Sequence, residues 1–287
     1  MVAVVFAAGA AALFGALAVT IRVALATDAD PDAGALVTTA VACVVCIAIA
    51  AALGQWSRVE WSDTWPFLAA GTIAPGISQL LFTRAVGLIG ASRTAILVGI
   101  SPVLSALIAI ALLGEPFRPA LGIGTLLIVA GGTLLAWDRG RPRALFTLGA
   151  GLAALGAVLF SARDNFVRWA ERSSSVPGVV AAACSLAAAT LVLALLVAVG
   201  GSARPRIAAA ARPFLLSGAI YGTAYAFLLS AFDRGRVTIV APLYATESLW
   251  AVVVSAVVLR RTENVGLRLA AAALLVVAGG ALIGGFR

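Results

Sequence analysis

Ten long apolar segments follow one another along this 287-residue chain, and they constrain its fold more than any other feature. Each is close to the ~20 residues that an α-helix needs to cross roughly 30 Å of hydrocarbon. Within a bilayer, only helices and closed barrels satisfy every backbone hydrogen bond, and segments of this length fit helices. We predict spans at 2–22, 33–54, 65–86, 94–113, 119–137, 144–163, 176–200, 213–232, 237–259 and 267–286.

The composition is typical of a protein that has lipid as its solvent. Hydrophobic residues make up 62% of the chain and charged residues only 11%, whereas a soluble domain carries about 25% charged residues. The first apolar segment starts without the basic stretch and cleavage site of a signal peptide, so we interpret it as a span. We expect a multi-pass protein of a prokaryotic plasma membrane.

Several classes of function are disfavoured by the residues present. The formal net charge is +8, but the arginines are scattered between apolar segments, so we predict no nucleic-acid partner. The chain has no His, which removes histidine metal ligands and a His-activated nucleophile. No glycine loop with a Lys could hold ATP phosphates. We therefore predict no cofactor, no metal and no enzymatic activity.

Two alternatives to a transporter are a membrane-embedded lipid-modifying enzyme and a channel. A metal-dependent enzyme of the first kind needs clustered acidic or histidine ligands. The one acidic cluster, at Asp28, Asp30 and Asp32, has the spacing and the proline of a solvated loop. A channel usually needs rings of equivalent groups built by several subunits.

An internal repeat divides the chain into two halves. The segment LLIVAGGTLL at 126–135 matches LLVVAGGALI at 274–283, 148 residues later, and at the same shift Glu115 aligns with Glu263. A duplicated unit with an odd number of spans must enter the membrane from opposite sides, an inverted repeat typical of secondary transporters. We predict an all-α protein with ten transmembrane helices as two inverted five-helix repeats, 1–138 and 144–287, connected by 139–143.

The first half resembles the EamA family of the drug/metabolite transporter superfamily. The motifs that carry the resemblance are RAVGLIGASRTAI at 84–96, Ser101-Pro102, LLGEP at 112–116 and Gly131-Gly132. The second half keeps Glu263 and Gly279-Gly280, but has RRTE at 260–263 where the family usually has Gly-Glu. The resemblance covers nearly the whole chain. It implies ten helices around a central cavity and the movement, often outward, of small organic solutes.

Glu247 is the foremost candidate for chemistry because it lies near the centre of the ninth predicted span. Polar groups are costly in hydrocarbon, so each one there is a candidate functional residue. Desolvation favours the neutral form of an unpaired carboxyl group. Our hypothesis is that Glu247 couples transport to protons or binds a cationic group of the substrate. The alternative is a neutral carboxyl that makes a structural hydrogen bond.

Other polar side chains within the spans are predicted to contact substrate. Tyr221 and Tyr225 are four residues apart and share one helix face, and Gln79 is the mid-span amide of the first half. Interhelical hydrogen bonds are the alternative role for such groups. The predicted substrate-binding set is Gln79, Tyr221, Tyr225, Tyr244, Glu247, Thr20 and Ser161.

Breaks and span ends supply the predicted structural or gating residues. Pro102 and Pro242 each interrupt the backbone ladder of a span. Glu115 and Glu263 close the fourth and ninth spans, where each is expected to cap the next helix.

Arginines lie at several predicted span ends. We expect Arg22, Arg84 and Arg163 to extend to the headgroups. The distribution of arginines places the termini outside, whereas the family resemblance implies termini inside. The expected partners are a small-molecule substrate and the lipid bilayer, with the chain as a monomer or homodimer.

Overall fold

The computed structural model describes residues 2–101, 104, 108, 119–136, 143–171, 174–201, 203–234, 243–244, 246–259 and 266–285. This part of the chain is helical and contains no strand, which confirms the prediction of an all-α polytopic membrane protein. Six helical segments within it are long and apolar enough to cross a membrane, and two shorter helices are also apolar. Pro102, Glu115, Pro242 and Glu263 lie outside the described residues.

The first helices are α1 (Val2–Leu25) and α2 (Pro31–Ala52). Proline fits the first position of α2 because its missing N–H would have no partner there. The carboxylate of Asp30 caps this helix by accepting hydrogen bonds from the backbone N–H groups of Asp32 and Ala33. Two short 3-10 turns, η1 (Gln55–Arg58) and η2 (Trp61–Thr64), then lead into the next span.

The third span is broken near its middle. It consists of α3 (Trp65–Gly71), the π-helical segment η3 (Thr72–Ile77) and α4 (Ser78–Ile89). Ala74 has extended backbone angles, φ −142° and ψ 119°, inside η3. The next residue is Pro75, which cannot donate a backbone hydrogen bond. The break therefore lies where the sequence places Pro75-Gly76.

The other described helices are α5 (Ala91–Val98), α7 (Pro119–Ala136), α8 (Arg143–Glu171), α9 (Gly178–Val199), α10 (Ala203–Arg234), α12 (Glu247–Val258) and α13 (Leu267–Gly285). Two differ clearly from the predicted spans. α8 continues eight residues beyond 163, and α10 begins ten residues before 213 with Pro213 inside it. The extension of α8 matters because it places Arg163 well within a helix.

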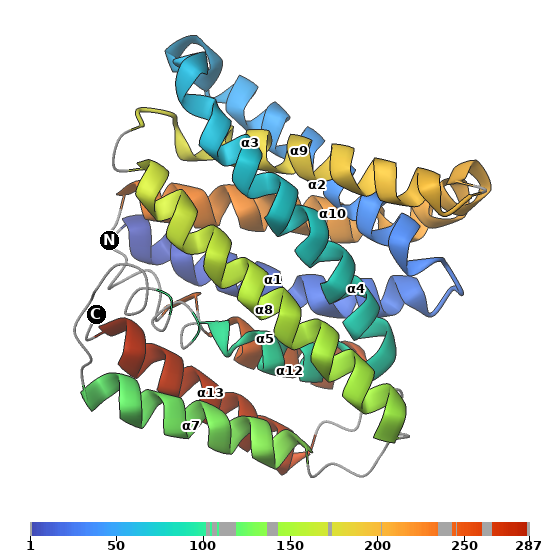
Figure 1. The fold of residues 1–287 in the computed structure, drawn as a ribbon, viewed down its shortest axis with the longest axis vertical. Coiled ribbons are helices and arrows are strands. Elements are labelled where there is room, and N and C mark those ends of the chain that lie inside the picture. The colour runs from blue at the N-terminus through green and yellow to red at the C-terminus, as the bar shows by residue number, and fades with distance from the viewer. Residues whose placement is uncertain are drawn as a thin grey trace.

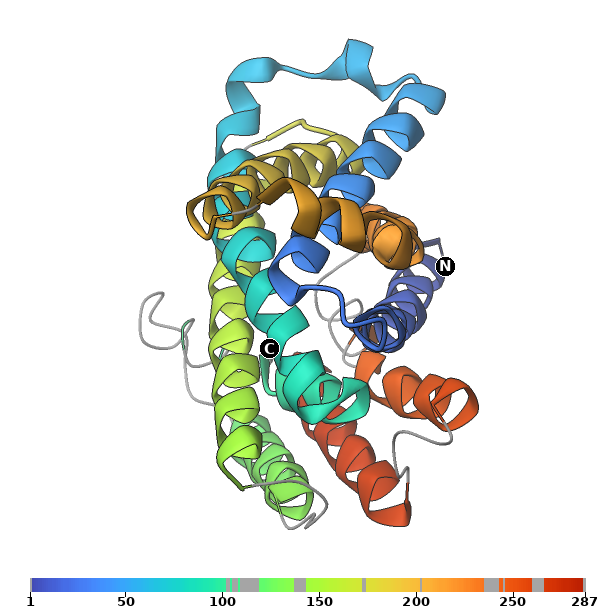
Figure 2. The same cartoon turned by 90° about the vertical axis from the view of Figure 1, so that its right-hand side faces the viewer.

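The helices form a bundle in which α10 packs along α1 and α2, α9 packs against α2 and α3, and α4 packs against α8 (Figure 1). Figure 2 shows α8 and α12 on opposite flanks of the bundle. Glycines allow close backbone contacts, since a Cβ at Gly222 would lie 2.7 Å from the carbonyl oxygen of Ala42. Small residues favour this type of packing in lipid, where burial from water does not drive helices together.

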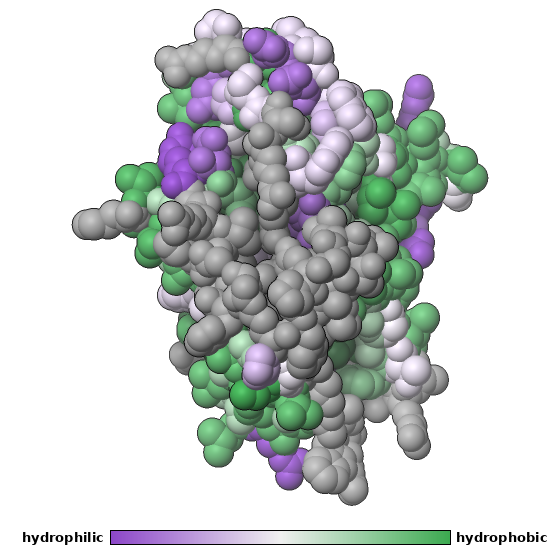
Figure 3. All heavy atoms as spheres, turned by 60° about the vertical axis from the view of Figure 1, so that its left-hand side comes forward, coloured by the Kyte–Doolittle hydropathy of each residue, from purple (hydrophilic) through white to green (hydrophobic). Residues whose placement is uncertain are grey.

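The surface has the apolar character that a bilayer requires. Leu191, Leu195 and Leu216 are each more than half exposed. On the face that Figure 3 shows, apolar residues cover much of the coloured surface, and hydrophilic residues gather in separate patches. Lipid chains can cover these exposed side chains, so they are consistent with a membrane-embedded bundle.

Candidate functional site

A cavity lies between helices from the early and the late parts of the sequence. The empty space between its lining atoms, including the part that is open to the outside, is about 480 Å³. Helices α1, α4, α5, α8, α10 and α12 contribute to its walls. The described residues that line it are Phe14, Gly15, Leu17, Gln79, Phe82, Ala95, Val98, Phe160, Arg163, Tyr221, Tyr225, Tyr244 and Glu247.

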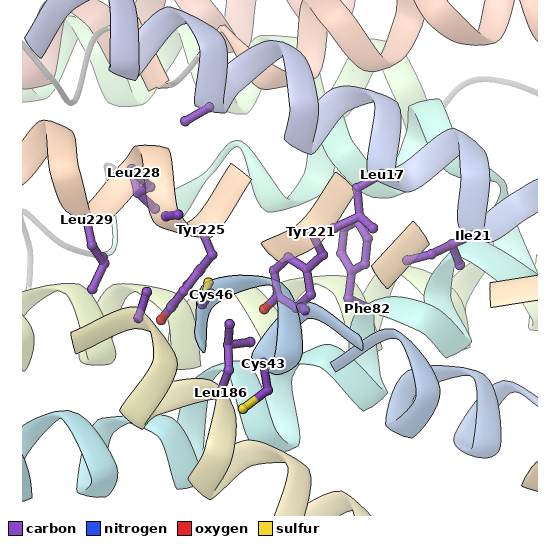
Figure 4. Packing of buried hydrophobic residues seen from close by; sticks show 14 of the residues in the cluster. Leu17, Ile21, Cys43, Cys46, Phe82, Leu186, Tyr221, Tyr225, Leu228 and Leu229 are labelled. Atoms are coloured by element: carbon purple, nitrogen blue, oxygen red, sulfur yellow. The ribbon is translucent and has the colours of Figure 1, made fainter. Parts of the chain in front are cut away.

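Aromatic rings form one side of this cavity. The ring of Phe14 lies edge-to-face with Tyr221 at 5.9 Å and with Tyr244 at 5.5 Å between centroids. Tyr221 and Tyr225, four residues apart on α10, are 5.8 Å apart. Figure 4 shows both tyrosines projecting from α10, with Leu17 and Phe82 close to Tyr221. The wall is thus mostly apolar but presents hydroxyl groups.

Arg163 is the residue that the sequence analysis placed incorrectly. Its side chain is only 3% exposed and lines the cavity instead of reaching the headgroups. Nη1 donates a hydrogen bond to the Tyr225 hydroxyl at 2.5 Å, and Nε lies 2.8 Å from Oδ1 of Asp164. The guanidinium carbon is 5.3 Å from the centroid of the Tyr225 ring. Tyr225 therefore accepts a hydrogen bond from Arg163 and Asp164 compensates its charge, while Nε makes no hydrogen bond in the described part of the chain.

Glu247 lies in the first turn of α12 and faces the same cavity. Its carboxyl group lies beside the Tyr244 hydroxyl, and it interacts electrostatically with Arg163 and Asp164. Gly15 of α1 packs directly on this turn, because a Cβ there would lie 2.8 Å from the carbonyl oxygen of Glu247. Only a residue without a side chain lets α1 approach so closely, and this contact positions Glu247.

The remaining predicted site residues divide into two groups. Gln79 is 2% exposed, lines the cavity and donates from Nε2 to the Thr83 hydroxyl at 3.5 Å. Thr20 and Ser161 are not among the described lining residues. The Thr20 hydroxyl donates to the Leu17 carbonyl of its own helix at 3.0 Å. The Ser161 hydroxyl lies 2.8 Å from the Ala157 carbonyl of its own helix and 2.9 Å from the carbonyl of Ser101.

A second cluster of charges lies at one end of the bundle, away from the cavity. Arg84 of α4 binds both carboxylate oxygens of Asp32 at 2.7 Å. Arg206 of α10 lies 2.7 Å from Asp30 and 3.6 Å from Asp32. We call these four residues the end cluster. Asp30 and Asp32 are thus ion-paired while still partly exposed, and the pairing of Arg84 with Asp32 is a contact that the sequence analysis did not predict.

The charge of Asp30 is stabilised within the end cluster. Burial by itself raises the pKa of this carboxyl group, but the hydrogen bonds from Arg206 and from the backbone of Ala33 and Asp32 outweigh it. The pKa of Asp30 is consequently lower than its ordinary value of 3.8. In the described part of the chain, no group of three or more His, Cys, Asp or Glu side chains is arranged to hold a metal ion.

Comparisons with known proteins agree with this architecture. The model of the EamA-like transporter family matches residues 1–137 and 147–285. An uncharacterized transporter in the cobO 3' region of Sinorhizobium sp is 35% identical over 127 residues, 44% of this chain and 90% of that protein. A crystal structure of another protein, 23% identical, superposes with a TM-score of 0.64 over 98% of this chain and 95% of the other. That last likeness concerns the fold alone.

Proposed function

Because this chain belongs to the EamA-like transporter family, within the drug/metabolite transporter superfamily, we propose that it is a secondary active exporter of small organic molecules in a prokaryotic plasma membrane. The substrate binds in the cavity between the two halves. Gln79, Tyr221, Tyr225, Tyr244 and Glu247 contact it, since all five line that cavity. Aromatic walls with a few polar groups are typical of sites that bind small solutes.

The proposed mechanism is alternating access by two inverted halves, 1–138 and 144–287, connected by 139–143. Two observations support it. The family match falls into one segment per half, and α1 and α8, the first helices of the halves, run in opposite directions across the bundle in Figure 1. A site enclosed between two such units opens to either side when one unit rocks against the other.

Glu247 couples this movement to protons in the proposal. The single observation that carries this role is a carboxyl group within the bundle that lines the cavity and has a tyrosine hydroxyl as its close neighbour. A carboxyl group in such surroundings is neutral when it holds a proton and costly when it does not. Proton binding and release can therefore decide which conformation the halves adopt.

The test is transport into proteoliposomes across an imposed pH gradient, with a panel of amino acids, nucleosides and cationic drugs. We expect saturable uptake of a panel member that follows the gradient, and a decrease of roughly tenfold or more in Glu247→Gln. Glu60→Gln is the matched control, because Glu60 is exposed outside the cavity.

Full, still pH-dependent transport by Glu247→Gln would remove the coupling role. Conductance that does not saturate with substrate would favour a channel instead. Absence of any gradient-driven flux across the panel, with folded protein in the vesicles, would contradict the proposed transport function.

A further inference from the structure

Ser185 of α9 is a buried contact between the two halves of the chain. Its side chain is fully buried, and its hydroxyl donates a hydrogen bond to the Phe67 carbonyl of α3 at 2.9 Å, across 118 residues of sequence. Gly71 of α3 packs on the backbone of Ser185, since a Cβ at this glycine would collide with the Ser185 carbonyl group. One hydrogen bond and one close backbone contact therefore hold α3 of the first half on α9 of the second.

The break in the third span separates α3 from α4. Ala74 has extended backbone angles within η3, and Pro75 follows it without an N–H group. A helix bends at such an interruption more easily than within its regular turns. Beyond the break, α4 packs against α8 and carries Gln79 into the cavity wall. The two parts of the span are thus attached chiefly to different helices of the second half, α3 to α9 and α4 to α8.

Tyr225 connects the contact at Ser185 with the cavity. Its hydroxyl accepts the hydrogen bond from Nη1 of Arg163 at 2.5 Å and is also hydrogen-bonded to the Ser185 hydroxyl. Figure 4 shows Tyr225 projecting from α10 into the bundle. A serine hydroxyl has one proton to donate, and that of Ser185 goes to Phe67, so Tyr225 is the donor to Ser185. We call this chain of hydrogen bonds, from Arg163 through Tyr225 and Ser185 to the backbone of α3, the relay.

A change at one end of the relay has a cost at the other end. Its members are buried, and buried polar groups need hydrogen-bond partners. Consecutive hydrogen bonds in a low dielectric also polarise one another, so weakening one of them weakens the next. A ligand that draws the guanidinium group of Arg163 further into the cavity therefore weakens the hold of Ser185 on α3.

We propose that Ser185 and Gly71 are positioning residues that transmit binding in the cavity to the break in the third span. Neither is among the described lining residues, so both act through Tyr225 and Arg163, which do line the cavity. A firm hold of α9 on α3 keeps the span in the arrangement of this structure, and release of α3 lets the span bend at the break. The inference rests on the proposed transport function, because it connects substrate binding with the movement of the halves.

The three tyrosines of the chain serve as probes in the first experiment, because Tyr221, Tyr225 and Tyr244 all line the cavity. The full chain labelled with 3-fluorotyrosine is expected to give one fluorine NMR signal per tyrosine in detergent, and substituting each tyrosine by Phe assigns the signals. Ser185→Ala removes the acceptor of the Tyr225 hydroxyl. The Tyr225 signal is therefore expected to shift by more than its linewidth, and the other two signals by less.

Further variants separate the relay from a general packing defect. Gly71→Ala pushes α3 away from Ser185 and is expected to shift the Tyr225 signal, whereas Ser185→Thr keeps the hydroxyl and is expected to leave it in place. Ser255→Ala is the matched control, because Ser255 is equally buried and its hydroxyl has no hydrogen-bond partner among the described residues. Thermal unfolding midpoints close to that of wild type establish that each variant is folded.

The second experiment measures the coupling in the reverse direction. A fluorinated tag is placed on Thr72→Cys, at the exposed first residue of η3, while the three native cysteines are buried. Coupling between two sites is reciprocal, so Tyr225→Phe is expected to change the signal of this tag. Tyr244→Phe, which alters the cavity outside the relay, is expected to leave the signal unchanged.

The third experiment follows transport in vesicles with the panel of amino acids, nucleosides and cationic drugs. For a panel member that wild type moves, Ser185→Ala is expected to lower the maximal rate about fivefold with little change in KM. The reason is that the movement of the halves, and not binding, depends on the relay. A purely structural Ser185 would lower the unfolding midpoint without this separation of rate from KM.

The outcomes distinguish the relay from transport itself. A Tyr225 signal that stays in place in Ser185→Ala, or that moves equally in Ser255→Ala, would overturn the relay. A tag signal that ignores Tyr225→Phe, together with an unchanged maximal rate in Ser185→Ala, would make Ser185 a structural contact and overturn the coupling. Folded wild-type protein that moves no panel member would count against the proposed function, while the two fluorine measurements would still decide whether the relay exists.

Discussion

The cavity and the end cluster contain the same kinds of charged residue in opposite settings. In the cavity, Arg163 is 3% exposed and its partner Asp164 is adjacent in sequence, with Glu247 as a third charge nearby. In the end cluster, Arg84 is 43% exposed and binds Asp32, which is 52 residues away in the chain. Among the described residues, the cavity group therefore has three charges around a buried arginine, whereas the end cluster has four charges and a more exposed arginine, Arg84.

This difference explains why we assign the two groups different roles. Two arginines and two aspartates neutralise each other and connect α2, α4 and α10, so the end cluster needs no ligand to be stable. In the proposed function, the described charges of the cavity group sum to zero when Glu247 holds a proton. The balance of opposite charges and their access to water, more than the residue types, therefore distinguish a structural ion pair from a binding site.

The largest effect on stability is expected when the cavity pair is broken. Arg163→Leu removes the partner of Asp164 and the hydrogen bond to Tyr225. Losing one member of a fully buried ion pair costs about 3–5 kcal/mol. Because the Asp164 side chain is 23% exposed, the expected cost here is lower, about 1–3 kcal/mol. This cost is measured as the loss of unfolding free energy in detergent. A variant as stable as wild type would show that the pair does not behave as a buried ion pair.

The double variant Arg163→Leu/Asp164→Leu separates lost attraction from stranded charge. If the uncompensated carboxylate causes the destabilisation, the double variant recovers most of the stability that the single variant lost. Additive losses would mean instead that packing of the two side chains dominates.

Sequence reasoning reached the fold and part of the site. The length of the apolar segments alone predicts helical spans. We expected polar groups in the middle of spans to be functional, and this selected Glu247 and Gln79, which line the cavity. The spacing of Tyr221 and Tyr225 placed both on the same face of α10. These successes depend on properties local to one helix.

The misplacement of Arg163 and the unpredicted contacts of Arg84 have different causes. The sequence analysis ended the predicted span at its first charged residue, Arg163. The helix α8 instead continues to Glu171 and carries the guanidinium group of Arg163 into the bundle. The run Arg163-Asp164-Asn165 was the available signal, since adjacent opposite charges allow an arginine to be buried. The contacts of Arg84 with Asp32 and of Arg206 with Asp30 join positions 52 and 176 residues apart, which a single sequence does not encode locally.

A smaller effect is expected at the end cluster. Arg84→Leu removes the bidentate contact with Asp32, but Arg84 is 43% exposed and Arg206 remains beside both aspartates. Exposed pairs of this kind contribute about 0–1 kcal/mol. The difference from wild type should shrink further in about 1 M salt, where the screening length is roughly 3 Å. A loss as large as that of Arg163→Leu would remove the distinction between the two clusters.

The smallest effect is expected when one charge of the end cluster is removed. Asp30→Asn keeps a helix-capping side chain at the start of α2, so it tests the contact with Arg206 and not the cap. Because the folded-state pKa of Asp30 lies below its ordinary 3.8, the ionised carboxylate stabilises the fold above that pH, and the contribution disappears as the pH falls through the folded value. We expect wild type to exceed the variant by a few tenths of a kcal/mol, about the value of an exposed pair, near neutral pH. This margin should vanish towards pH 2. A margin that stays constant or widens in acid would show that the carboxylate charge is not what Arg206 stabilises.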